Sequence, residues 1–180
     1  MTTRLVILGL LRERPLYGYE IKQLIEERGM EDWTSIAYGS IYFALGKLAD
    51  ERFIENVAVE QQGNRPSRSV YQITDAGRKE FLRLLREVWG TLDWPAFDIE
   101  VAVYFMAALP RAELVAYLRQ RVEGLTGAID KATAERDDHM RQPKVPRVVQ
   151  AIFSHGLTYL RGELAWTEDL LAQVEAGELP

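Results

Sequence analysis

The chain has 180 residues, of which 47% are hydrophobic and 27% are charged, and its formal net charge is −5. This composition is that of a folded globular protein, and it excludes a disordered or collagen-like chain. No apolar run reaches the ~18 residues of a membrane span, and the chain has no cysteine, which excludes disulfides and thiol chemistry. We therefore expect a cytoplasmic protein of one or two domains that has no membrane partner.

The charge is unevenly distributed along the chain. Residues 1–90 hold 13 basic and 13 acidic residues, whereas residues 91–180 hold 9 and 14, so the acidic excess lies in the second half. Residues 61–86 contain six basic and two acidic residues, a local charge of +4. The negative total does not exclude nucleic acid as a partner of the first half, because DNA is bound by local basic patches.

Residues 1–90 predict a mainly α-helical domain with a small β-hairpin. Helical spacing of apolar residues predicts helices over residues 3–13, 17–28, 39–52 and 76–89. Alternating apolar residues predict strands over 53–60 and 70–73, joined by turn-forming residues at 61–67. This order of three helices, a strand, a turn, a strand and a helix is typical of a winged helix-turn-helix.

Residues 91–180 predict an all-helical second domain. A proline-containing connection leads into a helix over 98–109 that is apolar nearly all round, which implies burial on several sides. Another helix follows Pro110, and the last spans 147–176. The last helix carries an apolar seam at steps of three and four residues: Phe153, Leu157, Leu160, Leu164, Leu171 and Val174. Such a seam needs a partner surface, which we expect in a second chain; the alternative is another helix of the same bundle.

Residues with catalytic chemistry are sparse. The two histidines, His139 and His155, lie on different predicted helices. They could bind a metal with Asp137 or Asp138, but this cluster is more typical of a solvated helix end. The sequence has no phosphate-binding glycine loop and no nucleophile motif. We expect no enzyme, no metal and no cofactor.

The third predicted helix has an unusual outward face. Ser40, Phe43 and Lys47 lie opposite the apolar stripe of this helix, and Tyr42 lies on its flank. In a helix-turn-helix this face enters the major groove of DNA, and the hydroxyl of Tyr42 is within reach of a phosphate. The alternative is that both aromatic side chains pack on neighbouring helices.

The predicted turn between the two strands is basic. Its sequence GNRPSR places Arg65 and Arg68 on a short protruding loop that could contact phosphates or enter the minor groove. The alternative is a solvated turn. One module of this size makes few contacts, so we expect a dimer on two half-sites.

Four segments carry a resemblance to a known family. They are LVILGLL at 5–11, PLYGYEIKQLIEE at 15–27, GSIYFALGKLADERFIE at 39–55 and GNRPSRSVYQITDAGRKEF at 63–81. With these motifs residues 4–86 resemble the PadR family of transcriptional regulators. The second half is similar to the longer helical dimerisation domain of that family in length and pattern.

The resemblance implies a homodimer that represses transcription from a palindromic operator until an effector binds. The DNA-contacting positions that it implies are Tyr19, Lys22, Ser40, Tyr42, Lys47, Arg65, Ser67 and Arg68. The third predicted helix matches the recognition helix of the family but is less basic than in basic relatives, because it ends in Asp50 and Glu51 and has only Lys47 within it. DNA affinity would then depend more on Arg65 and Arg68 in the turn between the two predicted strands, which is the wing of the domain.

An effector would bind in apolar space between protomers, since relatives bind phenolic acids or flat aromatic drugs. Aromatic side chains that could line this space are Trp89, Trp94, Phe97, Tyr104 and Trp166. The alternative is that they fill a core or an interface. A second function stays open, a winged-helix module that binds proteins and no DNA, because the first half has no net charge.

Overall fold

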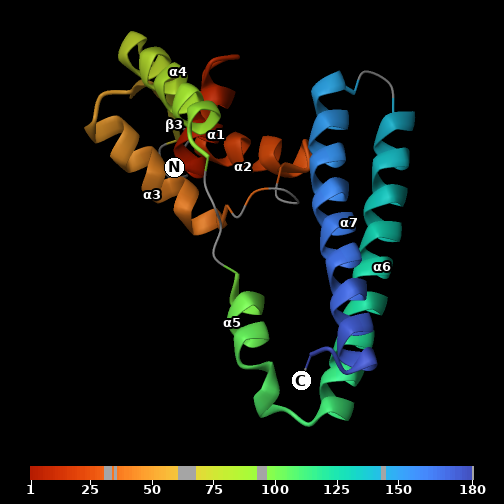
Figure 1. Ribbon diagram of the computed structural model, residues 1–180. Coiled ribbons are helices and arrows are strands. Elements are labelled where there is room, and N and C mark those ends of the chain that lie inside the picture. The colour runs from red at the N-terminus through yellow and green to blue at the C-terminus, as the bar shows by residue number, and fades with distance from the viewer. Residues whose placement is uncertain (31–33, 35, 61–67, 93–96, 143–144, 180) are drawn as a thin grey trace. The chain divides into compact units, whose positions relative to one another are not determined.

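The computed structural model describes residues 1–30, 34, 36–60, 68–92, 97–142 and 145–179, and at residues 38, 58–60 and 68 it describes the backbone alone. The chain divides into two compact units, Met1–Trp94 and Pro95–Pro180. Figure 1 labels their α-helices and strand β3. No helix in the described part of the chain is both long and apolar enough to cross a membrane.

The first unit has the mainly helical fold with a small antiparallel sheet that the sequence predicts. Its elements are α1 (Thr2–Leu11), β1 (Leu16–Tyr17), α2 (Gly18–Glu27), α3 (Tyr38–Asp50), β2 (Ile54–Glu60), β3 (Arg68–Ile73) and α4 (Asp75–Gly90). The strand order is β1-β3-β2, and both pairs are antiparallel. The sequence did not indicate β1, which pairs Leu16 with Tyr71, because two residues carry no periodicity.

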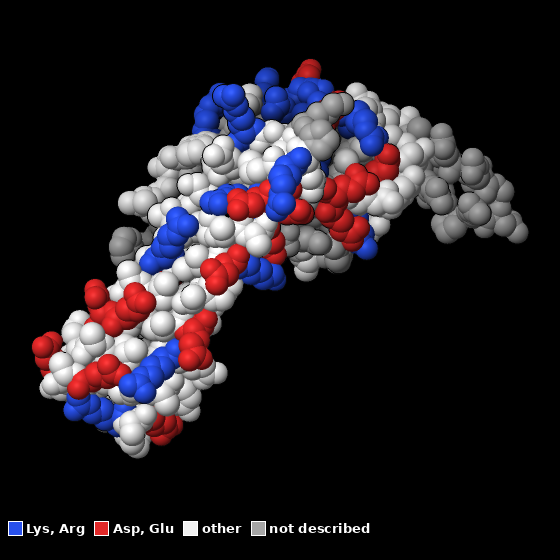
Figure 2. All heavy atoms as spheres, turned by 90° about the vertical axis from the view of Figure 1, so that its right-hand side faces the viewer, with Lys and Arg blue, Asp and Glu red and all other residues white. Residues whose placement is uncertain are grey.

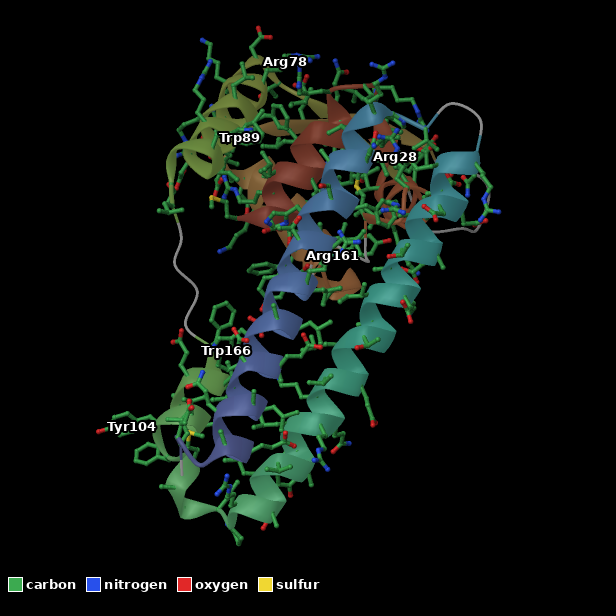
Figure 3. All side chains as sticks on the ribbon, turned by 45° about the vertical axis from the view of Figure 1, so that its right-hand side comes forward. Arg28, Arg78, Trp89, Tyr104, Arg161 and Trp166 are labelled. Atoms are coloured by element: carbon green, nitrogen blue, oxygen red, sulfur yellow. The ribbon has the colours of Figure 1, made fainter. Side chains whose placement is uncertain are left out.

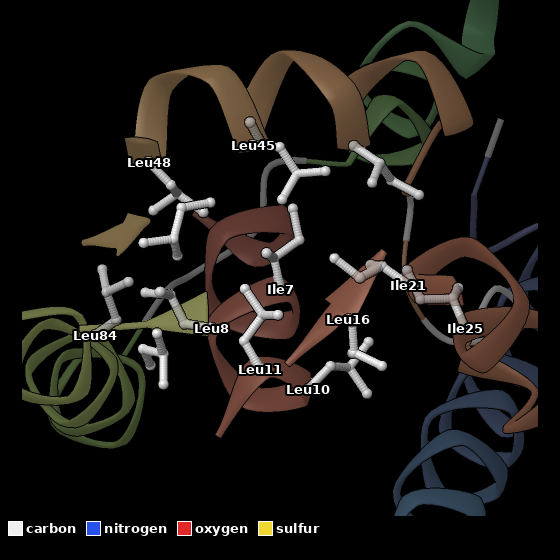
Figure 4. Close-up of a cluster of buried hydrophobic side chains, with 14 residues drawn as sticks. Ile7, Leu8, Leu10, Leu11, Leu16, Ile21, Ile25, Leu45, Leu48 and Leu84 are labelled. Carbon is white, nitrogen blue, oxygen red and sulfur yellow. The ribbon is translucent and has the colours of Figure 1, made fainter. Parts of the chain in front are cut away.

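The helices of this unit bury one apolar face each in a shared core. The stripe predicted on α3 is confirmed, since Ile41, Leu45 and Leu48 are at most 1% exposed. Figure 4 shows leucine and isoleucine side chains of α1, β1, α2, α3 and α4 meeting at its centre. The core therefore fixes which face of α3 is turned outward.

The start of α4 is fixed against the two residues before β2 by a cap and a glycine. Thr74 Oγ1 accepts a hydrogen bond from the Gly77 amide (3.0 Å) and donates one to the Arg52 carbonyl (2.8 Å). A Cβ atom at Gly77 would lie 2.0 Å from the Phe53 carbonyl oxygen. Only glycine permits this approach of helix and strand.

The second unit is built on two long helices that run antiparallel. Its elements are α5 (Asp98–Tyr104), the short 3₁₀ helix η2 (Met106–Ala108), α6 (Arg111–Arg141) and α7 (Arg147–Ala176). Met106, Leu118, Leu170 and Val174 form its buried apolar core. This core is small for two helices of 31 and 30 residues.

The predicted helix over 98–109 is shorter and less buried than the sequence implied. It ends at Tyr104 and continues as η2. Val101, Tyr104 and Phe105 are 58%, 82% and 62% exposed, and Tyr104 projects away from α6 and α7 in Figure 3. An apolar pattern all round the helix predicted several neighbours, but the described part of this chain covers one side only.

The apolar seam of α7 contacts α6 of the same chain. Leu157 and Val174 are buried, whereas the other four seam residues are partly buried. Between them Thr167, fully buried, accepts a hydrogen bond from Arg121 of α6, which also pairs with Glu163 at 2.6 Å. This intramolecular packing is the alternative that the sequence left open for the seam.

Candidate nucleic-acid interface

The outward face of α3 combines aromatic and polar side chains. Phe43 is 67% exposed and Tyr42 is 57% exposed. The Lys47 ammonium lies over the Phe43 ring, 4.9 Å from its centroid. Ser40 is partly buried, and its Oγ donates a hydrogen bond to the Ala37 carbonyl at 2.6 Å. The structure thus brings the four predicted side chains together on one accessible helix.

The preceding helix, α2, presents the two residues that the resemblance implies. Tyr19 is 41% exposed, and its ring stacks on Tyr17 with centroids 5.4 Å apart. Lys22 is partly buried and lies 3.5 Å from Glu26 on the next turn. The Tyr17 amide donates to the Glu20 carboxylate (2.8 Å), which caps the start of α2.

The acidic end of α3 is partly neutralised by a distant arginine. Arg4 of α1 donates to both carboxylate oxygens of Glu51, at 3.0 and 2.5 Å. These hydrogen bonds hold the pKa of Glu51 below its ordinary value. The unpaired negative charge at this end of α3 is therefore that of Asp50, which is exposed and is in no ion pair with the described residues.

The wing falls largely outside the described residues. Arg65 and Ser67 are outside them, and at Arg68 only the backbone is described, at the start of β3. Antiparallel pairing of β2 and β3 extends to Glu60 and Arg68, with an irregularity near Asn56. The two strands thus lead directly into the basic turn.

Helix α4 carries further cations of the first unit. Arg78, Lys79 and Arg86 are exposed and form no ion pair with the described residues; Arg78 projects from the outer side of α4 in Figure 3. Arg83 differs, because Glu80 and Glu87 both bind it at 2.7 Å. On the face shown in Figure 2, Lys and Arg gather along one edge, and acidic and basic side chains alternate over the rest.

The aromatic residues predicted for an effector site are distributed over both units. Trp94 lies outside the described residues, and Trp89 at the end of α4 is 84% exposed. In the second unit Phe97 stacks on Tyr159 with ring centroids 6.3 Å apart, and Trp166 is 38% exposed. Within the described residues no ring contact joins the predicted five to one another.

A pocket of about 340 Å³ lies between α6 and α7 near the end where they connect. Its lining is Arg136, Asp137 and Met140 from α6, and Gln150, Ser154, Leu157 and Arg161 from α7. Arg136 is paired with Asp137 at 2.7 Å, whereas Arg161 has no ion pair with the described residues. This pocket was not predicted from the sequence, where its signal was the polar residues spaced by whole turns beside the seam.

The two histidines do not gather ligands around them. His139 packs its ring against Phe153, with centroids 5.5 Å apart, and shares a hydrogen bond with the Glu135 carbonyl. Among the described residues no group of three or more histidine, aspartate or glutamate side chains is placed to hold a metal ion.

The first unit matches a known family of proteins. Residues 7–83, which hold the core, α3 and both strands of the hairpin, match the Transcriptional regulator PadR-like family. The match covers most of the first unit of the chain. The resemblance noted in the sequence is therefore confirmed.

The likeness to PadR proteins extends beyond this domain. The negative transcriptional regulator PadR of Bacillus subtilis is 24% identical over 175 residues, covering 94% of this chain and 95% of the relative. The crystal structure of Bacillus subtilis PadR with operator DNA has a TM-score of 0.71 at 23% identity, covering 97% and 99% of the two chains. Its complex with p-coumaric acid has a TM-score of 0.72 at 22% identity, with the same coverage. At these identities the structures establish that the fold is shared.

Proposed function

We propose that this protein is a transcriptional repressor that binds double-stranded DNA as a homodimer, with α3 in the major groove. One observation carries the proposal: α3 is anchored by a fully buried stripe and presents exposed Tyr42, Phe43 and Lys47 on its other face. In a helix-turn-helix, the helix that enters the major groove is held by the core and exposes polar and aromatic side chains to the bases. We assign the protein no catalysis and place it with the DNA, in the cytoplasm.

Base and backbone contacts divide between the elements of the domain. Ser40 and Lys47 lie towards base edges, and Tyr42 lies on the flank of the helix, where a hydroxyl reaches phosphate. Tyr19 and Lys22 of α2 lie beside the backbone of the duplex. Arg65, Ser67 and Arg68 of the wing contact phosphates or the minor groove.

The proposed dimer forms through the helical unit. Val101, Tyr104 and Phe105 give α5 an exposed apolar surface, and Tyr159 and Trp166 on α7 are 48% and 38% exposed. Exposed large apolar side chains of this kind are typical of an interface. The partly exposed members of the α7 seam, Phe153, Leu160, Leu164 and Leu171, would contribute at its border, and buried Leu157 and Val174 would support it from within.

Replacing Tyr104 and Phe105 together by serine tests the dimer. Both side chains are mostly exposed, so the fold should persist, and light scattering should report a monomer with a strongly reduced affinity for DNA. Leu82→Ser, at a side chain of α4 that is 40% exposed, is the control and should remain dimeric. A double variant that stays dimeric would place the interface elsewhere.

DNA binding is tested directly by selection from a random duplex pool. The selected sequence should be palindromic, and the logarithm of the binding constant should fall linearly with the logarithm of salt concentration. Arg65→Ala with Arg68→Ala should weaken binding and lower the salt slope by about two per protomer. Arg147→Ala, which removes an exposed charge of the second unit, is the control. No enrichment of any DNA, with capture of a stable protein partner, would favour the protein-interaction module instead.

We also propose that a small effector releases the DNA, in the manner that the p-coumaric acid complex of Bacillus subtilis PadR suggests. Two sites are candidates, the predicted aromatic set and the pocket that contains Arg161. Adding p-coumaric acid to the protein–DNA complex should release the DNA. Arg161→Met should abolish release if the pocket binds the acid, whereas Trp89→Ala should do so if the aromatic set does. Arg147→Met is the matched control, and release unaffected by either change would exclude both sites.

A further inference from the structure

We propose that Phe43 recognises the C5 methyl group of a thymine in the major groove; the inference rests on the DNA-binding function proposed above. Phe43 is 67% exposed although it belongs to a helix whose opposite face is completely buried. The described part of this chain covers little of this large apolar ring, although the helix that carries it is anchored. Its exposure is explained if a partner covers it.

The position of Phe43 on α3 selects that partner. Since α3 begins at Tyr38, Phe43 lies in the half of the helix that meets base edges in a helix-turn-helix. Base edges in the major groove present hydrogen-bond donors and acceptors, and the thymine methyl is the apolar group among them. An aromatic side chain at this position therefore matches thymine and no other base.

The two neighbouring aromatic side chains of α3 differ in what they contact. A Cβ atom built at Gly18 of α2 would lie 3.1 Å from Cε1 of Tyr42, so the Tyr42 ring packs closely over the start of α2. Phe43 is in no ring stack with the described residues, and the ammonium of Lys47 lies over its face. Phe43, and not Tyr42, is thus the ring that is free to meet a base.

The contact with Lys47 positions this ring. The ammonium lies 4.9 Å from the ring centroid, one helical turn further along α3. It occupies one face of the ring and leaves the edge and the opposite face for the methyl group. The same ammonium is then placed beside the base, where it can bind a guanine edge or a phosphate.

The test uses a duplex that the wild-type protein selects from a random pool, with one thymine at a time replaced by deoxyuridine. This change removes the C5 methyl group and keeps every hydrogen-bonding group. At one position in each half-site the replacement should weaken wild-type binding about fourfold, the effect of exposing one buried methyl group. In Phe43→Ala the thymine and uracil duplexes should bind equally at that position.

Two variants separate this role from others. Lys47→Met should weaken the binding of both duplexes and keep a difference between them, and Leu82→Ala should behave as wild type. The inference is overturned if Phe43→Ala retains the wild-type ratio at every position, or if no thymine methyl affects wild-type binding. A pool that yields no DNA at all would instead refute the DNA-binding function, and this inference with it.

Discussion

Replacing Gly46 by alanine should increase the stability of the fold and decrease its affinity for DNA. Gly46 lies in the interior of α3 and is exposed, and no atom of the described residues lies within 4 Å of a Cβ atom built there. An exposed glycine inside a helix costs about 1 kcal/mol relative to alanine. The free energy of unfolding of the alanine variant should therefore be higher by about this amount, and its urea midpoint should be higher too.

The expected effect on DNA binding has the opposite sign. Gly46 lies between Phe43 and Lys47 on the outward face, so its added methyl group would stand between α3 and the floor of the groove. We expect a loss of at least about tenfold in affinity, which corresponds to 1.4 kcal/mol. Glycine at this position is then explained by close approach to DNA and not by packing.

Stability is measured by urea unfolding and by hydrogen exchange of the α3 amides. DNA affinity of the same variant is measured by fluorescence anisotropy. Gly124→Ala in α6 is the matched control, because that glycine is also exposed and has no described atom within 4 Å of a built Cβ. It should gain similar stability with unchanged DNA affinity. A Gly46→Ala protein that is more stable and binds DNA as tightly as wild type would refute close docking of this face.

Three further predictions concern the fold that presents α3. Gly77→Ala should destabilise the domain by about 3 kcal/mol or more in urea unfolding, because its Cβ would lie 2.0 Å from the Phe53 carbonyl oxygen; an unchanged midpoint would contradict this contact. Arg52, with φ of 61°, ends α3 in the left-handed region. Arg52→Gly should raise stability by about 1 kcal/mol, and a loss would show that the arginine side chain outweighs the strain. Arg4 lowers the pKa of Glu51 in the folded state, so this pair stabilises the fold above the ordinary glutamate pKa of 4.5 and loses its effect as the pH falls through the lower folded value. The loss should be less than about 1 kcal/mol, because the pair is exposed. In Arg4→Met this loss should be absent from the pH dependence of the free energy of unfolding.

The sequence by itself determined the elements of the first unit and the face that each buries. Apolar spacing along α3 identified the stripe at Ile41 and Leu48 and hence the opposite, outward face, because helix periodicity is local. The hairpin was predicted from alternation and turn residues for the same reason. Strand β1 was missed, since its two residues become a strand only by pairing with Tyr71.

Tertiary structure decided what lies against each predicted face. The α7 seam required a partner, and in the folded chain it packs against α6, the helix that directly precedes it. Glu51 is paired with Arg4, 47 residues away, and the pocket at Arg161 is lined by side chains of both α6 and α7. The sequence shows which side chains are apolar and which are charged. Which group packs against them or pairs with them depends on distance in space, and only the folded chain sets that distance.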